Sequence, residues 1–288
     1  MSSHPRIEAS RRIKNVAGVA AIIVLAALAL SPLFHIVAVV VLNGLRAIEL
    51  TGPLDFLAAP PNPQNPRHPG GIGPALAGTA ILVALTSIFS IALALPTGVF
   101  VAEFRRAGIS RLTLVLTLIL VEFPTVLVGL TVYATEVKWV QRYNMLAGAI
   151  ALAIVVLPYM AVHVSEALRH VPKDLREAAF SLGASRLKTV YEVVLSVARR
   201  GILVGILIGV AKAAGETAPL LFTVGGFFDT YPSGLLKPGG AVPLMIYEYI
   251  QQPGQGYHML AWGAALVLMV IVFAVMIIAR MGVKEVRL

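Results

Sequence analysis

The sequence predicts an all-α integral membrane protein with six transmembrane helices. Only 13% of its 288 residues are charged and 58% are hydrophobic, whereas soluble domains contain about 25% charged residues. Uncharged runs at 15–45, 68–102, 143–165 and 249–279 are each long enough for a membrane span of about 20 residues. The third observation is an uneven distribution of lysine and arginine among the connecting segments, which distinguishes the two sides of the membrane.

Hydropathy and length define six expected spans. They are 16–42, 73–102, 112–134, 145–168, 197–217 and 258–280. The first is expected to be a retained helix, because its apolar run exceeds the roughly 7–15 residues of a signal-peptide core and no small-residue cleavage site follows it. The chain has no cysteine, which excludes disulfides and thiolate metal sites.

The basic residues indicate the orientation. Placing the N-terminus in the cytoplasm puts 17 of the 23 lysines and arginines on that side, as the positive-inside rule requires. This distribution accounts for the formal net charge of +9 without nucleic acid as a partner. We expect a multi-pass protein of the plasma (inner) membrane with both termini in the cytoplasm.

The segment 169–200 is the longest charge-rich stretch, and it is expected to form two short amphipathic helices joined at Gly183. Apolar residues recur in each half at the spacing of one helical face. Gly183 suits the left-handed conformation that ends a helix, and Ser185 suits the cap of the next. Small alanines on the apolar face let another surface approach closely, so we predict a contact with a partner protein. The residues assigned to this contact are Glu177, Ala178, Ala179, Leu182, Gly183 and Leu187.

Two long loops are assigned to the outer side. Loop 43–72 contains a proline-rich polar stretch that cannot form a helix interior. It is either a stiff extended connector or a docking surface for an extracytoplasmic partner. Loop 218–257 contains the apolar piece 220–224, which is too short to span the membrane. This piece must be re-entrant or packed against protein, because lipid does not tolerate irregular backbone.

Enzyme motifs are absent from the sequence: there is no GxxxxGK[ST], HExxH or GxSxG. The six histidines show no metal-ligand spacing. We therefore expect a chain that is not itself an enzyme and that binds no cofactor and no metal. Ionisable residues inside spans are costly, so each is a functional hypothesis. The candidates are Glu122 in the third span, Lys212 and Glu216 in the fifth, and Thr217 directly beyond them.

Two interpretations of these candidates remain open. In the first, the charges hold helices together, and Lys212 pairs with Glu122 or with Glu216, which lies one turn later on the same helical face. In the second, Lys212 and the Thr217 hydroxyl face a partly hydrated anion along a polar path, since lysine attracts an anion without bidentate grip. Both can hold, because a carboxylate neutralises the lysine when the path is empty.

The string EAAFSLG at 177–183 resembles the EAA loop of ABC importer permeases. The matching residues are Glu177, Ala178, Ala179 and Gly183, whereas Val193 replaces an isoleucine and Ser196 replaces a proline. The resemblance implies a type I importer (MetI-like) permease core. It also implies that this loop, at about 169–196, is a coupling helix in a groove of a cytoplasmic ATPase subunit.

Three further strings resemble the PstA-type permeases of phosphate importers: GGIGPALAGT (70–79), KAAGETAPLLFTVGG (212–226) and VPLMIYEYIQQP (242–253). Members of that branch usually carry arginine where Lys212 stands. The resemblance implies a five-helix permease core over 70–288, preceded by a cytoplasmic tail, first span and outer loop over 1–69. The partners that it implies are cytoplasmic ATPase subunits carrying ATP and Mg²⁺, a second homologous permease, an extracytoplasmic phosphate-binding protein and phosphate.

The expected function is therefore to form half of the translocation pore of an ATP-driven importer of inorganic phosphate, working by alternating access. A permease for another oxyanion is the alternative within this class. An ion-coupled secondary transporter that uses Glu122 and Lys212 is the alternative from a different class. An integral-membrane enzyme is disfavoured, because the sequence presents no nucleophile, base or metal cluster.

Overall fold

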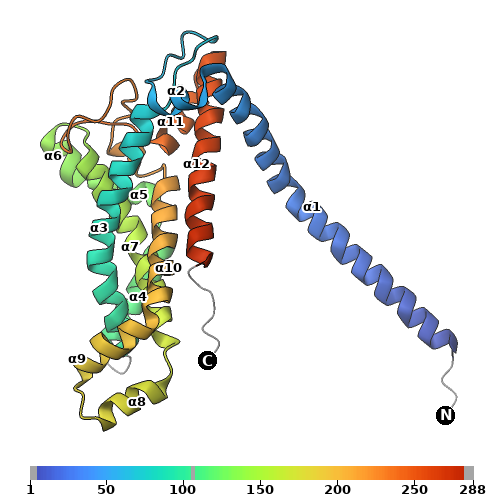
Figure 1. Ribbon diagram of the computed structural model, residues 1–288, viewed down its shortest axis with the longest axis vertical. Helices are drawn as coiled ribbons and strands as arrows, with labels where there is room; N and C mark the ends of the chain where they lie inside the picture. Colours follow the sequence, from blue (N-terminus) through green and yellow to red (C-terminus); the bar gives the residue numbers. More distant parts are fainter. Residues whose placement is uncertain (1–4, 105–107, 282–288) are drawn as a thin grey trace.

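The computed structural model describes residues 5–104 and 108–281, and the described chain is a bundle of helices (Figure 1). Five helices are long and apolar enough to cross a membrane. They are α1 (Pro5–Thr51), α3 (Gly73–Glu103), α7 (Met145–Arg169), α10 (Leu195–Gly215) with the turns that precede it, and α12 (Gln255–Met281).

Helix α7 lies at the centre of the bundle, between α3 and α10 (Figure 1). Its most apolar window is 67% buried, and many of the buried residues are alanine, glycine or serine. Small residues allow close packing between helices in a membrane, where lipid tails are as apolar as the side chains. Hydroxyls of α3 add interhelical hydrogen bonds, from Thr86 to the Ala149 carbonyl at 3.3 Å and from Ser90 to the Ala153 carbonyl at 3.4 Å.

The expected third span, 112–134, is broken rather than continuous. Its two arms are α4 (Gly108–Glu122), and then α5 (Thr125–Val132), η1 (Tyr133–Val137) and α6 (Lys138–Val140) in succession. The second arm is bent by 96° from the first. Pro124 explains the break, because it has no N–H for the helix ladder and its ring clashes with the carbonyl four residues earlier. The count of six spans holds when the bent pair is taken as one.

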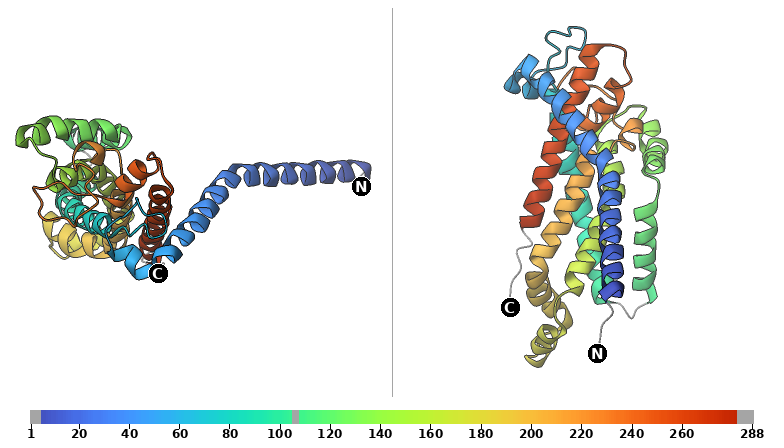
Figure 2. Two further views of the ribbon diagram at one scale, coloured as in Figure 1. Left: turned by 90° about the horizontal axis from the view of Figure 1, so that it is seen from above. Right: turned by 90° about the vertical axis from the view of Figure 1, so that its right-hand side faces the viewer.

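The first helix is longer than the expected span 16–42. Helix α1 leans away from the other helices (Figures 1 and 2), and none of its most apolar window is buried within the chain. Its last turns pack against α12, where a Cβ added to Gly44 would lie 2.6 Å from the Leu266 Cβ. Most of the apolar surface of α1 is therefore available to lipid or to another chain.

The second amphipathic helix expected in 169–200 is not separate. Helix α8 (Lys173–Ser181) ends before Gly183 as expected, but α9 (Arg186–Lys188) and the π-helical turn η2 (Thr189–Val194) continue directly into α10. The result is one helix over 186–215 of 30 residues. The expected span 197–217 thus falls in the C-terminal part of a longer helix whose first turns are charged. The helix starts earlier than expected because Ser185 accepts a hydrogen bond from Lys188 N at 3.3 Å and caps it, and the helix continues to Gly215.

The end of the molecule opposite α8 is closed by α2 (Pro53–Ala58), α11 (Val242–Tyr249) and the loops beside them (Figure 1). The piece 220–224 packs against protein as expected: Leu220 and Val224 are 1% and 0% exposed within the main hydrophobic core. The proline-rich loop is not an extended connector, because it closes on itself through hydrogen bonds from Asn62 N to the Pro69 carbonyl and from Gly71 N to the Pro60 carbonyl.

Both described ends of the chain, the start of α1 and the end of α12, point toward the end of the molecule that carries α8 (Figures 1 and 2). This placement agrees with the expectation that the termini and the segment 169–200 share one side of the membrane. The end of α3 and the start of α4 lie at the same end (Figure 1).

The partial burial of the Glu248 carboxyl group on α11 leads us to expect that the stability of the protein depends on pH. Its carboxylate packs against Gly226, whose added Cβ would lie 2.5 Å from Oε1, and burial raises the pKa of Glu248 above its ordinary value. A raised folded-state pKa means that stability is lost as the pH rises through that pKa. We expect Glu248→Gln to raise the melting temperature of the purified protein at alkaline pH and to leave it nearly unchanged at acid pH. The same melting-temperature difference at both pH values in thermal unfolding would contradict this account.

Candidate functional site

The residues singled out in the sequence lie in two separate places. Lys212, Glu216 and Thr217 lie where α10 ends, within the bundle, and the candidate contact residues lie on and beside α8 at one end of the molecule (Figure 1). Glu122 belongs to neither group of contacts.

The first place is a polar site built around Lys212. Helix α10 ends at Gly215, and Glu216 has an extended backbone, so its side chain reaches back along the last turn. Lys212 Nζ lies 3.4 Å from Glu216 Oε2, and the two side chains are 27% and 15% exposed. Thr125, the first residue of α5, donates a hydrogen bond to Glu216 Oε1 at 2.9 Å. Of the two carboxylates considered for Lys212, the structure pairs it with Glu216.

Tyr159 of α7 completes the polar site. Lys212 Nζ lies 4.5 Å from the centre of the Tyr159 ring, which is a cation–π contact. The Tyr159 hydroxyl donates to the Val121 carbonyl at 3.0 Å. That carbonyl is in the last turn of α4. Because the helix is broken there, no backbone N–H four residues later serves as its donor, and the Tyr159 hydroxyl takes that role. The broken span therefore supplies two of the contacts that position Lys212, one through Tyr159 and one through Thr125.

This arrangement holds a positive charge at a partly open position between four helices. One side of the ammonium group faces a carboxylate and another faces an aromatic ring, so its charge is balanced but not enclosed. The ammonium group of a lysine has three donors on a flexible stem, so Lys212 has donor capacity beyond its contact with Glu216.

Glu122, the other carboxylate considered as a partner of Lys212, does not pair with it in the structure. Glu122 is the last residue of α4 and is exposed at the bend. It lines a shallow pocket of about 500 Å³ whose other walls are apolar. Among the residues that the structure describes, its side chain makes no hydrogen bond or ion pair. Thr217 lies in the turn after α10, where its carbonyl accepts hydrogen bonds from Leu220 N and Leu221 N.

The second place is the loop around α8, which presents apolar side chains to solvent. Leu182 is 90% exposed and Leu187 is 65% exposed, and exposed apolar patches of this kind mark interaction surfaces. The expected apolar face is divided, because Ala179 is buried within the chain whereas Glu177 and Ala178 are exposed. Other exposed apolar side chains of this end are Leu175, Phe180 and Tyr191.

Gly183 has the conformation that the sequence predicts, with φ at +82°. Gly183 N bonds to the Phe180 carbonyl at 2.9 Å, and Ala184 N bonds to the Ala179 carbonyl at 3.1 Å. These are the two hydrogen bonds of a Schellman cap, which glycine favours because it has no Cβ. The cap sets the direction in which the chain leaves α8.

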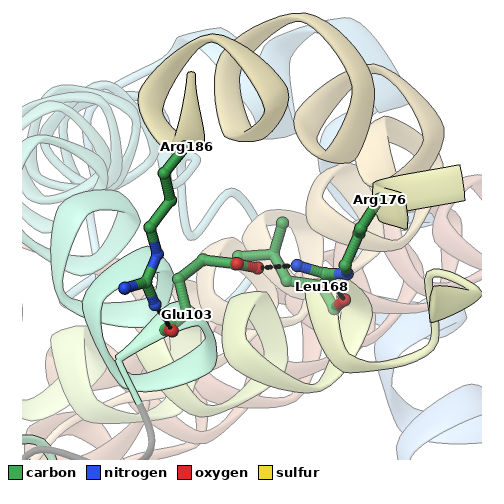
Figure 3. Close-up of polar contacts among 4 residues, drawn as sticks. All are labelled: Glu103, Leu168, Arg176 and Arg186. Carbon is green, nitrogen blue, oxygen red and sulfur yellow. Dashed lines mark hydrogen bonds and ion pairs between the residues drawn. The ribbon is translucent and has the colours of Figure 1, made fainter. Parts of the chain in front are cut away.

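A cluster that sequence reasoning missed joins the loop to the bundle at Glu103, the last residue of α3 (Figure 3). Arg176 of α8 forms an ion pair with the Glu103 carboxylate and donates to the Leu168 carbonyl at 2.8 Å. Arg186 donates to the Glu103 carbonyl and lies 4.2 Å over the ring of Phe104. We call these residues the Glu103 cluster. The available signal was an acidic residue at the inner end of a span, but nothing local identifies its partner 73 positions away.

Metal ligands do not gather in the part of the chain that the structure describes: no three histidine, aspartate or glutamate side chains are placed to hold an ion.

Comparison with known proteins gives a consistent result. Residues 94–288 match the family model described as binding-protein-dependent transport system inner membrane component. A Methanocaldococcus jannaschii protein named probable phosphate transport system permease protein PstA is 43% identical, over 90% of this chain and 89% of its own. The phosphate transport system permease protein PstA of Xylella fastidiosa (strain Temecula1) is 34% identical, over 94% of this chain and 92% of its own.

Solved structures show the same fold. A chain of the MetNI methionine ABC transporter, solved in inward-facing conformations, superposes with a TM-score of 0.58. The superposition covers 72% of this chain and 95% of that one at 19% sequence identity.

Proposed function

The chain belongs to the family of binding-protein-dependent transport system inner membrane components, and on this premise we propose that it is the permease subunit of an ATP-driven importer of inorganic phosphate. The observation that supports phosphate as the substrate is the 43% identity, over about nine-tenths of both chains, to a relative named as a phosphate permease. The chain forms part of the membrane pathway, and the hydrolysis of ATP belongs to its partners.

The partners follow from this role. Cytoplasmic ATPase subunits, which carry ATP and Mg²⁺, receive α8 in a groove, and the exposed Leu182 and Leu187 are side chains suited to such a contact. A second, homologous permease supplies the other half of the pore. A phosphate-binding protein docks at the opposite end of the molecule, over α2, α11 and their loops. The protein lies in the inner membrane with α8 and both termini in the cytoplasm, as the basic residues indicate.

The polar site gives the pathway an anion-selective step. In the resting arrangement Glu216 neutralises Lys212 at 3.4 Å. When phosphate reaches this level, its oxygens take the place of the carboxylate at Lys212 Nζ, and Glu216 remains bonded to Thr125. Since the Lys212 side chain is 27% exposed, the exchange takes place in contact with water and without full desolvation of the anion. Alternating access then opens this site first to the outer side and next to the inner side.

Uptake competition tests the substrate. In vesicles containing the assembled transporter and its binding protein, we expect ATP-dependent phosphate uptake that arsenate inhibits strongly and sulfate inhibits weakly. Arsenate shares the shape and protonation of phosphate. Sulfate has no proton to donate, so a site with a hydrogen-bond acceptor for the phosphate OH group would leave that acceptor unpaired when sulfate binds. Sulfate inhibition equal to that of arsenate would instead assign another oxyanion. Uptake that needs an ion gradient but no ATP would make the protein a secondary transporter.

A further inference from the structure

We propose that Glu103 is the joint through which a movement of α8 reaches the membrane-spanning helices α3 and α7. In this account Glu103 and Arg176 are positioning residues of the transport cycle, and they touch neither phosphate nor ATP. The inference rests on the proposed function, because a permease driven by ATPase subunits must pass their movement from the loop to the bundle.

The contacts of Arg176 connect three helices. Its guanidinium pairs with the carboxylate of Glu103 at the end of α3 and donates to the Leu168 carbonyl, one residue before the end of α7 (Figure 3). A guanidinium holds its donors in a rigid fork, so the two contacts fix direction as well as distance. A displacement of α8 along this fork must therefore displace the inner ends of both α3 and α7.

Arg186 adds a second connection to the same residue. It lies in the first turn of the helix that continues into α10, donates to the backbone carbonyl of Glu103 and stacks on Phe104. Arginine is favoured here because the last carbonyls of a helix carry partial negative charge. The side chain of Glu103 thus binds α8, while its backbone carbonyl binds Arg186 of α9.

Burial distinguishes the Glu103–Arg176 pair from the ion pair of Lys188 with Glu192 in the same loop. The side chains of Glu103 and Arg176 are 9% and 20% exposed, whereas those of Lys188 and Glu192 are 61% and 64% exposed at 3.9 Å. An exposed pair of that kind contributes little. Removal of one partner from a buried pair leaves an uncompensated charge and is strongly unfavourable. The Glu103 pair is therefore suited to transmit force, and the Lys188 pair serves as its matched control.

The chain joins α8 directly to α7 through residues 170–172, whereas its route from α8 to α10 is longer. That route passes through Gly183, at φ +82°, and then through the π-helical turn η2. Helix α3 is not adjacent to α8 in the chain, so the Glu103 pair supplies a link that the backbone does not. A cavity of about 340 Å³ separates Phe180 of α8 from Thr189 and Val190 of η2, with Glu103, Arg176 and Arg186 in its walls. Helix α8 also contacts η2, but its link to α3 is the ion pair of Arg176 with Glu103.

The first experiment measures coupling in the assembled transporter. We expect Glu103→Gln to assemble and hydrolyse ATP but to import about tenfold less phosphate per ATP, as the loss of a charged hydrogen bond implies. Arg176→Lys, which keeps the charge but loses the fork, should show the same defect. The exchange of charges in Glu103→Arg with Arg176→Glu should recover part of the coupling lost in each single variant. Glu192→Gln, the control, should behave as wild type.

The second experiment observes the movement itself. The chain has no native cysteine, so spin labels at Ser181→Cys on α8 and Thr97→Cys on α3 can report one interhelical distance. We expect this distance to stay constant between the nucleotide-free and the ATP-trapped transporter, and to change between these states in Glu103→Gln. A distance that changes in the wild-type background would overturn the proposal, as would wild-type coupling in Glu103→Gln. Failure of the unmodified transporter to import phosphate would instead overturn the proposed function.

Discussion

Gly183→Val is expected to abolish ATP-driven phosphate uptake while the protein still inserts and folds in the membrane. No atom lies within 4 Å of a Cβ added at Gly183, so the substitution causes no clash. Its effect is on the backbone, because a left-handed residue with a Cβ costs about 1–2 kcal/mol and the cost is greater for a β-branched side chain. The chain leaves the φ of +82°, the Schellman cap is lost, and α8 no longer presents Leu182 in its original direction.

Two controls make the test of Gly183 specific. Asparagine tolerates the left-handed region, so Gly183→Asn should retain most of the uptake. Gly18→Val adds the same bulk at a position on α1 that also has no atom within 4 Å, and it should leave uptake unchanged. The measurements are membrane insertion by fractionation and phosphate uptake in vesicles. Normal uptake by Gly183→Val would remove the argument that α8 docks on an ATPase.

Lys212→Gln is expected to reduce phosphate transport strongly without changing assembly of the complex. The substitution removes the positive charge of the polar site and leaves the Glu216 carboxylate, 15% exposed, without its ammonium partner at 3.4 Å. The carboxylate keeps its hydrogen bond from Thr125, so the loss is that of one hydrogen bond between charged groups, about 1.5–3 kcal/mol. Uptake kinetics and the yield of the purified complex measure the two effects separately.

A double variant separates the two roles of Lys212. Lys212→Gln with Glu216→Gln removes both charges, so no carboxylate is left unpaired. If Lys212 attracts the anion, the double variant stays as inactive as Lys212→Gln; recovery of uptake would reduce Lys212 to a packing role. Lys212→Arg keeps the charge beside Tyr159, and we expect it to remain active.

The loop is the part that could be predicted most completely from local sequence. A glycine seven positions into the string EAAFSLG, followed by a serine, indicated the end of one helix and the start of another, and both are found at Gly183 and Ser185. Such signals are readable because a cap involves residues only a few positions apart. The burial of Ala179, in contrast, depends on how α8 packs against the rest of the chain, including η2.

The broken span was partly readable. Pro124 was present in the expected span 112–134, and proline in a helix interior predicts a kink or a break. The 96° bend, however, depends on how the second arm packs: a Cβ added to Gly129 of α5 would lie 2.6 Å from the Cα of Pro219. That contact turns α5 toward the end of α10 and brings Thr125 to Glu216, while it leaves Glu122 outside.

Composition, hydropathy and the positions of charge were sufficient to predict a helical membrane protein, its expected sides and an amphipathic loop suited to a partner protein, because each depends on residues that are adjacent or one helical turn apart. The pairing of Lys212 with Glu216, four positions away, belongs to the same local class. The contacts of Tyr159 with Lys212 and of Arg176 with Glu103 do not. They join separate helices, and helix periodicity specifies which side of a helix a residue occupies but not which helix will face it. That choice follows from bends, crossing angles and close packing, which only the folded chain defines.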